Sequence, residues 1–179
     1  CRGLSVTDCT LLQNDLSQIQ AWCREWQMEI NVNKTKFLNF TTKKNITQID
    51  YSLSSIPIEK VTSYKYLGIN FNHNLSWEPH INYISAKANR SLGFLKRHLY
   101  KATQETKLIA YNSLIRPQLE YASIVWNPHQ LYLEEKLEAV QNRATRFILR
   151  NYQPTSVTDM KAKLNLPLLK HRRKVSRLT

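Results

Sequence analysis

The first part of the sequence places apolar residues at helical spacing. Counting from residue 12, they recur at intervals of 4, 3, 4 and 3: Leu12, Leu16, Ile19, Cys23 and Trp26. Such intervals put all five on one face of an α-helix. Thr7 or Asp8 can cap the first turn, because a short polar side chain accepts hydrogen bonds from the free backbone N–H groups there. The pattern predicts an amphipathic helix up to about Trp26.

The pattern then changes to that of short strands. Residues 28–33 alternate apolar and polar, as a half-buried strand does, and residues 37–40 resemble a second short strand. Residues 51–58 and 61–71 are further strand candidates, and Pro57 restricts the former to an edge or an end. We therefore expect an α+β arrangement in this part of the chain.

The remainder of the sequence reads as helical. Apolar residues fall within one arc over residues 81–101 and again over residues 131–150. Thr103 can cap a helix between these two, with a break or kink at Pro117, which has no backbone N–H to donate. Ser156 opens a shorter helix, because an acidic residue three positions later completes a capping box.

The charge of +13 is concentrated in this helical part. Residues 1–85 hold 8 Lys/Arg and 7 Asp/Glu, whereas residues 86–179 hold 18 and 6. Solubility alone does not require that asymmetry. The charge distribution favours binding of a polyanion by the second half of the chain, and the alternatives are a merely basic surface or contact with an acidic membrane. No apolar run approaches the roughly 20 residues of a membrane span, and no secretory signal is visible, so we expect an intracellular, reducing location.

The sequence contains few of the residue patterns that a self-contained enzyme needs. Its four aspartates are far apart, whereas two-metal phosphoryl transfer needs carboxylates that converge on the ions: Asp8, Asp15, Asp50 and Asp159. The three cysteines form no Cys-x-x-Cys pair and no His pair follows them at finger-like spacing, so we expect no metal site. We also find no hydrolase, zincin or phosphate-loop motif.

A mixed basic and aromatic stripe is the first candidate site. Its members recur at intervals of 4, 3, 4, 3 and 4: Tyr83, Lys87, Arg90, Phe94, Arg97 and Lys101. Cations suit a phosphate backbone, and aromatic rings suit stacked bases or sugars. The alternative is a solvated basic face whose two aromatic residues pack on a neighbouring element.

Two further basic groups are candidates. On the helix over residues 131–150, Arg143 and Arg146 lie away from the apolar face, although acidic residues at the start of that helix fit an ordinary dipole-matched helix equally well. The basic cluster at residues 171–174 is compatible with a groove contact, a localisation signal or a frayed end.

Lys34 is the last candidate, in the segment over residues 31–36. A lysine where a strand meets a turn can place its ammonium near a transferring phosphate. A solvated turn is the alternative.

Several motifs, in this order, resemble the region after the catalytic aspartates in reverse transcriptases of non-LTR retrotransposons, especially the jockey-like group. The resemblance covers nearly the whole chain. Its motifs are Leu12–Leu16 with Ile19–Cys23 and Trp26, residues 31–36, Tyr64–Ile69, Leu75–Trp77, Ile115–Pro117 with Leu119–Tyr121 and Trp126–Pro128, and Gln141–Ala144.

The resemblance implies roles for individual residues. Lys34 matches the lysine of the fourth palm motif, near the incoming nucleotide, where it assists pyrophosphate departure. Tyr66, Leu67 and Gly68 match the primer grip, a hairpin that positions the primer 3′ end. The helices from residue 80 onward match the thumb, which holds the template–primer duplex by its backbone.

The resemblance also implies the domain organisation and the partners. Residues 1–79 would form the end of the palm with short antiparallel strands, and residues 80–179 a helical, thumb-like domain. The family's catalytic aspartates precede the matched region, so we expect a fragment that binds no cofactor and leaves Mg²⁺ to the rest of the polymerase chain. Its partners would be an RNA template and a DNA primer, in the nucleus when chromosomal DNA is the target.

Two other functions remain open from the sequence. One is a non-catalytic nucleic-acid-binding module derived from, or resembling, such an element. The other is a helical protein whose positive charge meets an acidic protein partner.

Overall fold

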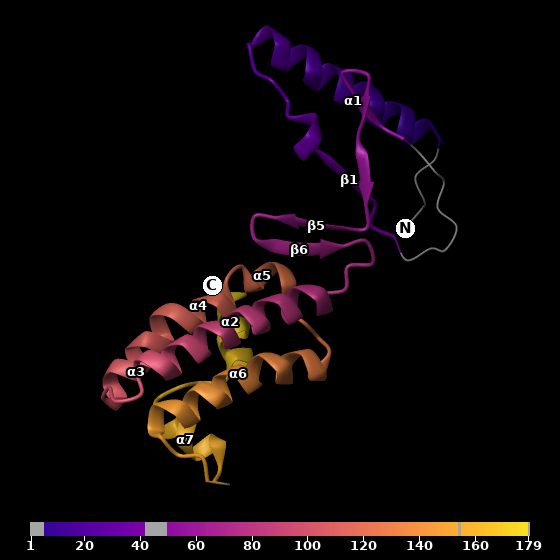
Figure 1. Cartoon of the computed structure of the whole chain (residues 1–179). Coiled ribbons are helices and arrows are strands. Elements are labelled where there is room, and N and C mark those ends of the chain that lie inside the picture. Colours follow the sequence, from indigo (N-terminus) through magenta and orange to yellow (C-terminus); the bar gives the residue numbers. More distant parts are fainter. Residues whose placement is uncertain (1–5, 42–49, 154, 179) are drawn as a thin grey trace. The chain divides into compact units, whose positions relative to one another are not determined.

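The structure is a computed structural model that describes residues 6–41, 50–153 and 155–178. The chain groups into two compact units, Cys1–Ser76 and Trp77–Thr179 (Figure 1). The first combines one helix with short strands and the second is helical, so the α+β prediction is confirmed. No helix in the described ranges has the length and apolar content that crossing a membrane requires.

The first unit contains one long helix and three two-stranded pairs. The hairpins β2–β3 and β5–β6 are antiparallel, as predicted, but β1 and β4 pair in parallel. Its elements are α1 (Val6–Glu25), the 3₁₀ turn η1 (Val32–Lys34), β1 (Lys36–Leu38), β2 (Ser52–Leu53), β3 (Ile56–Pro57), β4 (Glu59–Val61), β5 (Ser63–Tyr66) and β6 (Ile69–Asn72).

The strand predicted over residues 28–33 is wrong. Residues 28–31 have no regular structure, and residues 32–34 form the 3₁₀ turn. Asn31 caps that turn, because its side-chain oxygen accepts a hydrogen bond from the Lys34 N–H at 3.1 Å. The cap satisfies the local backbone without a neighbouring strand, and this local bond competes with the alternation that favoured a strand.

The apolar face of α1 is only partly covered within its unit. Ile19 and Trp26 are 51% and 63% exposed. Instead, two glutamines hold the β2–β3 hairpin: Gln13 exchanges two hydrogen bonds with the backbone of Ser52, at 2.9 and 3.0 Å. Gln20, two turns later, accepts a bond from the Ser54 N–H at 3.0 Å. These amides act as an additional strand edge beside β2.

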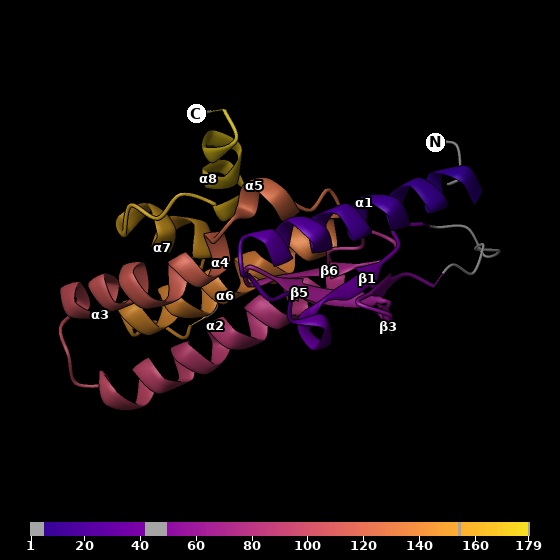
Figure 2. The same cartoon turned by 90° about the horizontal axis from the view of Figure 1, so that it is seen from above.

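The second unit is built on two long helices. In Figures 1 and 2, α2 and α6 run side by side. The elements are α2 (Glu78–His98), α3 (Gln104–Ala110), the π-helical turn η2 (Tyr111–Ile115), α4 (Arg116–Glu120), α5 (Ser123–Trp126), α6 (Leu131–Leu149), α7 (Val157–Lys163) and α8 (Leu169–Ser176). The caps predicted at Thr103 and Ser156 are confirmed, since each side chain accepts a hydrogen bond from a backbone N–H three residues later.

The break expected at Pro117 takes the form of a π-helical turn just before it. The Arg116 N–H bonds to the Tyr111 carbonyl, five residues back. Proline lacks an N–H and its ring crowds the preceding turn, so a wider turn relieves the conflict without ending the helix. The helix predicted from Thr103 through Ile115 therefore consists of two segments, α3 and η2, and α4 continues the chain past the proline.

The C-terminal basic cluster is ordered within α8. Arg173 is buried, and its Nε donates to the Asn127 side-chain oxygen at 3.1 Å. Arg172 donates through Nε and Nη2 to the Glu120 carboxylate, a pairing that raises the pKa of Arg172. These contacts rule out a frayed end for the two arginines.

Glu138 on α6 joins several segments of this unit. Its carboxylate accepts hydrogen bonds from Lys161 Nζ at 2.8 Å, from Gln141 Nε2 at 3.0 Å and from the Leu169 N–H at 3.0 Å. The side chains of Glu138 and Lys161 are 18% and 9% exposed, so the pair is largely removed from solvent. Gln141 in turn accepts a 2.6 Å bond from the buried Tyr111 hydroxyl.

We predict that Glu138→Gln lowers the free energy of unfolding of the helical unit by about 2–3 kcal/mol, because a mostly buried Lys161 ammonium loses its counter-charge. Urea denaturation followed by circular dichroism measures the change. Hydrogen exchange should show the earliest loss of protection in α7 and α8.

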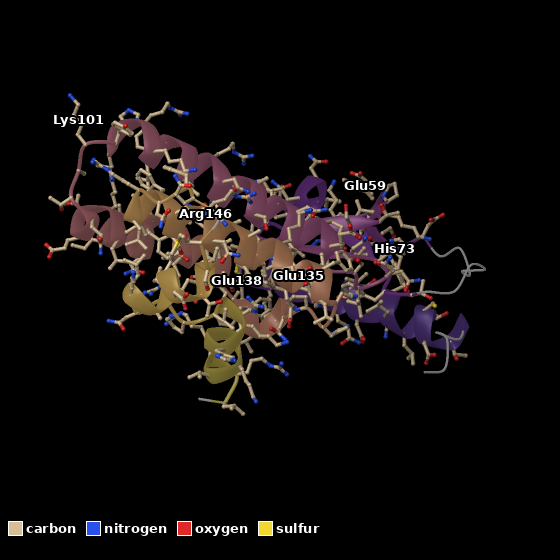
Figure 3. All side chains as sticks on the ribbon, turned by 90° about the horizontal axis from the view of Figure 1, so that it is seen from below. Glu59, His73, Lys101, Glu135, Glu138 and Arg146 are labelled. Atoms are coloured by element: carbon tan, nitrogen blue, oxygen red, sulfur yellow. The ribbon has the colours of Figure 1, made fainter. Side chains whose placement is uncertain are left out.

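Glu135→Gln is the matched control, because Glu135 lies on the same helix but is exposed (Figure 3). It removes the same charge and should change stability by less than about 0.5 kcal/mol. Equal effects of the two substitutions would contradict the role assigned to Glu138.

Candidate nucleic-acid interface

The predicted basic stripe lies on the solvent-facing side of α2. Five members are on the helix and Lys101 follows its end, because α2 both begins and ends three residues before the predicted 81–101. All six side chains are exposed. We call this set the α2 stripe: Tyr83, Lys87, Arg90, Phe94, Arg97 and Lys101. The buried face of α2 points elsewhere, and its apolar members include those predicted: Ile81, Ile84, Ala88, Leu92 and Leu95.

The four cations of the α2 stripe have no ion-pair partner among the described residues. Several other cations do, and these are Lys36, Arg116, Lys161, Lys170 and Arg172. A lone exposed cation forms its strongest contact with an external anion, whereas a paired one is already neutralised. The α2 stripe thus presents four cations that can bind an external anion.

Arg143 lies on the flank of α6 that borders α2. Lys136 and Arg150, each seven residues from Arg143, share this flank because two helical turns separate them. Lys136 donates to the Asn82 side chain, and Arg150 donates to the Tyr100 carbonyl at the other end of α2. Arg143 lies between these two contacts and is exposed, so it can extend the positive surface of α2.

Arg146 is placed differently. It lies three residues after Arg143, so the two are neighbours on the surface of α6, but Arg146 is half-buried whereas Arg143 is exposed. Arg143 is therefore the more accessible of the two to an external anion.

Lys107 shows that position matters more than residue type. It is buried on α3, with Nζ 5.0 Å from the centre of the Phe147 ring. Burial, and secondarily the charge of Arg150, lowers the pKa of Lys107. This lysine packs in the interior and is unavailable to a phosphate.

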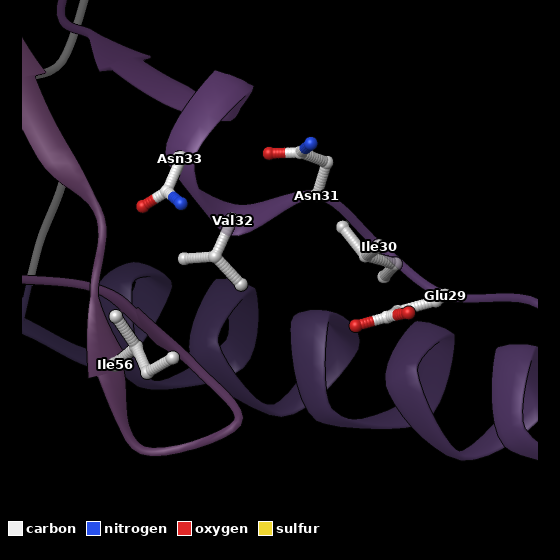
Figure 4. Close-up of a pocket in the computed structure, with 6 residues that line it drawn as sticks. All are labelled: Glu29, Ile30, Asn31, Val32, Asn33 and Ile56. Atoms are coloured by element: carbon white, nitrogen blue, oxygen red, sulfur yellow. The ribbon is translucent and has the colours of Figure 1, made fainter.

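In the first unit, the Lys34 turn is tied to the β5–β6 hairpin. The Tyr64 hydroxyl, on β5, donates to the Lys34 carbonyl at 3.1 Å, and the Lys34 side chain is exposed. The same turn borders a pocket of about 360 Å³, lined by residues 29–33 and by Ile56 of the β2–β3 hairpin (Figure 4). One unit thus contains both Lys34 and the predicted primer-grip residues.

The β5–β6 turn has unusual backbone geometry. Leu67 and Gly68 have φ values of 46° and 86°, both positive as in the two-residue type I′ turn. Glycine adopts this region freely, but leucine does so at a cost of about 1–2 kcal/mol. Leu67 is also 71% exposed and Tyr66 59% exposed. Both side chains are thus accessible at the tip of the hairpin.

The sequence patterns missed Ser91 and Gln118, which lie beside the α2 stripe. Together with Arg90, Phe94, Leu95 and Leu114 they line a groove of about 360 Å³ between α2 and the η2–α4 segment. Ser91 falls between the stripe and the buried face. Gln118 follows the π-helical turn, which shifts the helical phase, so regular spacing could not place it.

Comparison with known proteins identifies two relatives, both from Drosophila melanogaster. The chain is 23% identical over 140 residues to a "Probable RNA-directed DNA polymerase from transposon X-element". It is 26% identical over 141 residues to a "Probable RNA-directed DNA polymerase from transposon BS". Each match covers 76% of this chain but only 15% and 16% of the relatives.

No family model matches the chain, and no solved structure does. The chain is therefore similar to transposon RNA-directed DNA polymerases over three quarters of its length, and it spans about a sixth of theirs.

We predict that Leu67→Asn stabilises the β5–β6 hairpin by about 1 kcal/mol, because asparagine tolerates positive φ and Asn-Gly is the preferred type I′ pair. Hydrogen exchange of the β5 and β6 amides measures the change. Leu67→Ala is the control: it shortens the side chain but keeps the strained φ, and should leave the protection unchanged. Equal gains in both variants would contradict the strain at Leu67.

Proposed function

We propose that this chain holds the template–primer for an RNA-directed DNA polymerase of a non-LTR retrotransposon of the jockey-like group. The observation that carries the proposal is the α2 stripe, with four exposed cations that have no ion-pair partner among the described residues. The similarity to two transposon polymerases makes a template–primer the polyanion that best fits.

The two units would have different roles in binding the template–primer. Residues 80–179 would act as the thumb. The α2 stripe, the exposed Arg143 and the half-buried Arg146 would contact phosphates of the duplex. Residues 1–79 would end the palm, with Tyr66, Leu67 and Gly68 at the primer 3′ end. The positive φ of Gly68 supports this placement, because a residue without a Cβ allows a strand to approach the backbone closely.

Lys34 would assist at the incoming nucleotide. Its exposed ammonium can neutralise charge on a departing pyrophosphate. The hydrogen bond from Tyr64 to its carbonyl supports this role, since it fixes the backbone of Lys34 to the strand that leads to Tyr66.

The metal ions of the reaction would be held by other parts of the polymerase. Among the residues that the structure describes, no three His, Cys, Asp or Glu side chains converge as a metal site requires. When bound, Mg²⁺ supplies charge neutralisation at the transferring phosphate. This chain would contribute binding and positioning, in the nucleus where chromosomal DNA is the target.

We predict that binding of the chain to a DNA–RNA duplex weakens linearly in a plot of log K against log salt, with a slope of about −0.9 per neutralised phosphate. The triple variant Lys87→Glu, Arg90→Glu, Arg97→Glu should make that slope shallower by about 3, because three phosphate contacts are lost. Fluorescence anisotropy over a salt series measures both slopes.

The control is a triple variant of equal charge, Lys163→Glu, Lys174→Glu, Arg177→Glu, at exposed positions of α7 and α8 and just beyond α8. It should weaken binding modestly through the total charge and keep the slope. An unchanged slope in the α2 variant would move the binding surface elsewhere. Weak binding of the unaltered chain to the duplex would favour an acidic protein partner.

We also predict that the 179 residues alone bind template–primer but add no nucleotide, because the four aspartates of the sequence are too far apart to form a pair for metal-assisted transfer. A primer-extension assay with Mg²⁺ and deoxynucleotides measures this. Extension by the chain alone would contradict the prediction.

A further inference from the structure

The groove beside the α2 stripe combines the chemical groups that hold a flat, polar-edged ring. Its apolar lining comes from Leu95 and Leu114, and Arg90 brings one of the unpaired stripe cations to its edge. Its volume is about 360 Å³. All six lining residues belong to the helical unit, so the groove does not depend on the placement of the first unit.

Phe94 supplies a prepared stacking surface. One face of its ring is stacked on His98, with the ring centres 4.0 Å apart and the planes at 27°. His98 is itself held, because its Nδ1 lies 2.9 Å from the Phe94 carbonyl oxygen. The Phe94 ring is nevertheless 51% exposed and lines the groove. A ring fixed on one side and open on the other can accept a base with little loss of rotamer freedom.

Gln118 supplies a fixed acceptor in the same groove. Its Nε2 donates to the Leu114 carbonyl at 2.6 Å and to Ser91 Oγ at 3.0 Å. The amide is therefore oriented, and both of its donor hydrogens are used. Its Oε1 has only a long 3.4 Å contact with Ser91 Oγ, so it retains capacity to accept a bond from a base N–H.

We infer that this groove binds one unpaired nucleobase of a nucleic-acid strand whose phosphates lie along the α2 stripe; the inference rests on the proposed function. A base-paired duplex keeps its base faces stacked inside, so it can use the cations but not the Phe94 face. An unpaired base can stack on Phe94, while Arg90 pairs with a neighbouring phosphate. The chain thereby distinguishes a single-stranded stretch from a duplex.

The test begins with the unaltered chain. Its affinity is measured by fluorescence anisotropy for three DNA probes of equal phosphate number: a single strand, the same strand without its bases (abasic), and a blunt duplex. We expect the strand with bases to bind about 5- to 150-fold more tightly than the abasic strand, as expected for one aromatic stacking contact.

The assignment to the groove is tested with two variants and a control. Phe94→Ala should remove the preference for the strand with bases over the abasic strand, whereas Phe94→Trp should keep the preference. Tyr152→Ala removes another exposed aromatic ring of the same unit and should change neither affinity. Circular dichroism verifies that each variant is folded.

The outcomes separate this inference from the proposed function. The groove inference is overturned if the strands with and without bases bind equally, or if the preference survives in Phe94→Ala. In either case the proposed function still stands as long as binding depends on salt. No binding to any of the three probes defeats the proposed function itself. A preference lost in Phe94→Ala and retained in Phe94→Trp and Tyr152→Ala supports the inference.

Discussion

The carboxylate of Glu138 is the constraint on which the arrangement of the helical unit depends. It accepts bonds from α7, from the start of α8 and from Gln141, which passes the connection on to Tyr111 in the π-helical turn. A buried carboxylate requires several donors to offset its lost hydration, and here each donor comes from a segment that must be in place. One side chain therefore couples four parts of the unit.

This internal charge network also decides which cations remain available outside. The second half of the chain has 18 Lys/Arg and 6 Asp/Glu, and Glu120, Glu134 and Glu138 are all engaged with basic residues of α4, α7 and α8. These carboxylates thus pair with cations of α4, α7 and α8, and the cations of the α2 stripe have no ion-pair partner among the described residues. An unequal distribution of the acidic residues, rather than the total charge, creates the positive surface.

Periodicity predicted the regular elements, and local chemistry explains where it failed. The long helices α1, α2 and α6 follow from spacing alone, because every turn repeats the same side-chain geometry. The strand over residues 28–33 failed because the Asn31 side chain satisfies the backbone locally. For the candidate site, the α2 stripe could be read from spacing, whereas the groove could not. Gln118 is brought beside Phe94 by contacts between separate helices, and no local pattern encodes them.

The π-helical turn before Pro117 has a consequence for the surface that follows it. A wide turn inserts an extra residue into the helical repeat, so every later side chain is rotated by about 100° relative to a regular helix. The turn therefore changes the rotational position of the side chains of α4 relative to those of α3. Without it, Gln118 would face a different direction and the groove would lose its polar wall. The proline, which by sequence predicts only an interruption of the helix, thus sets the rotational position of Gln118 in the groove wall.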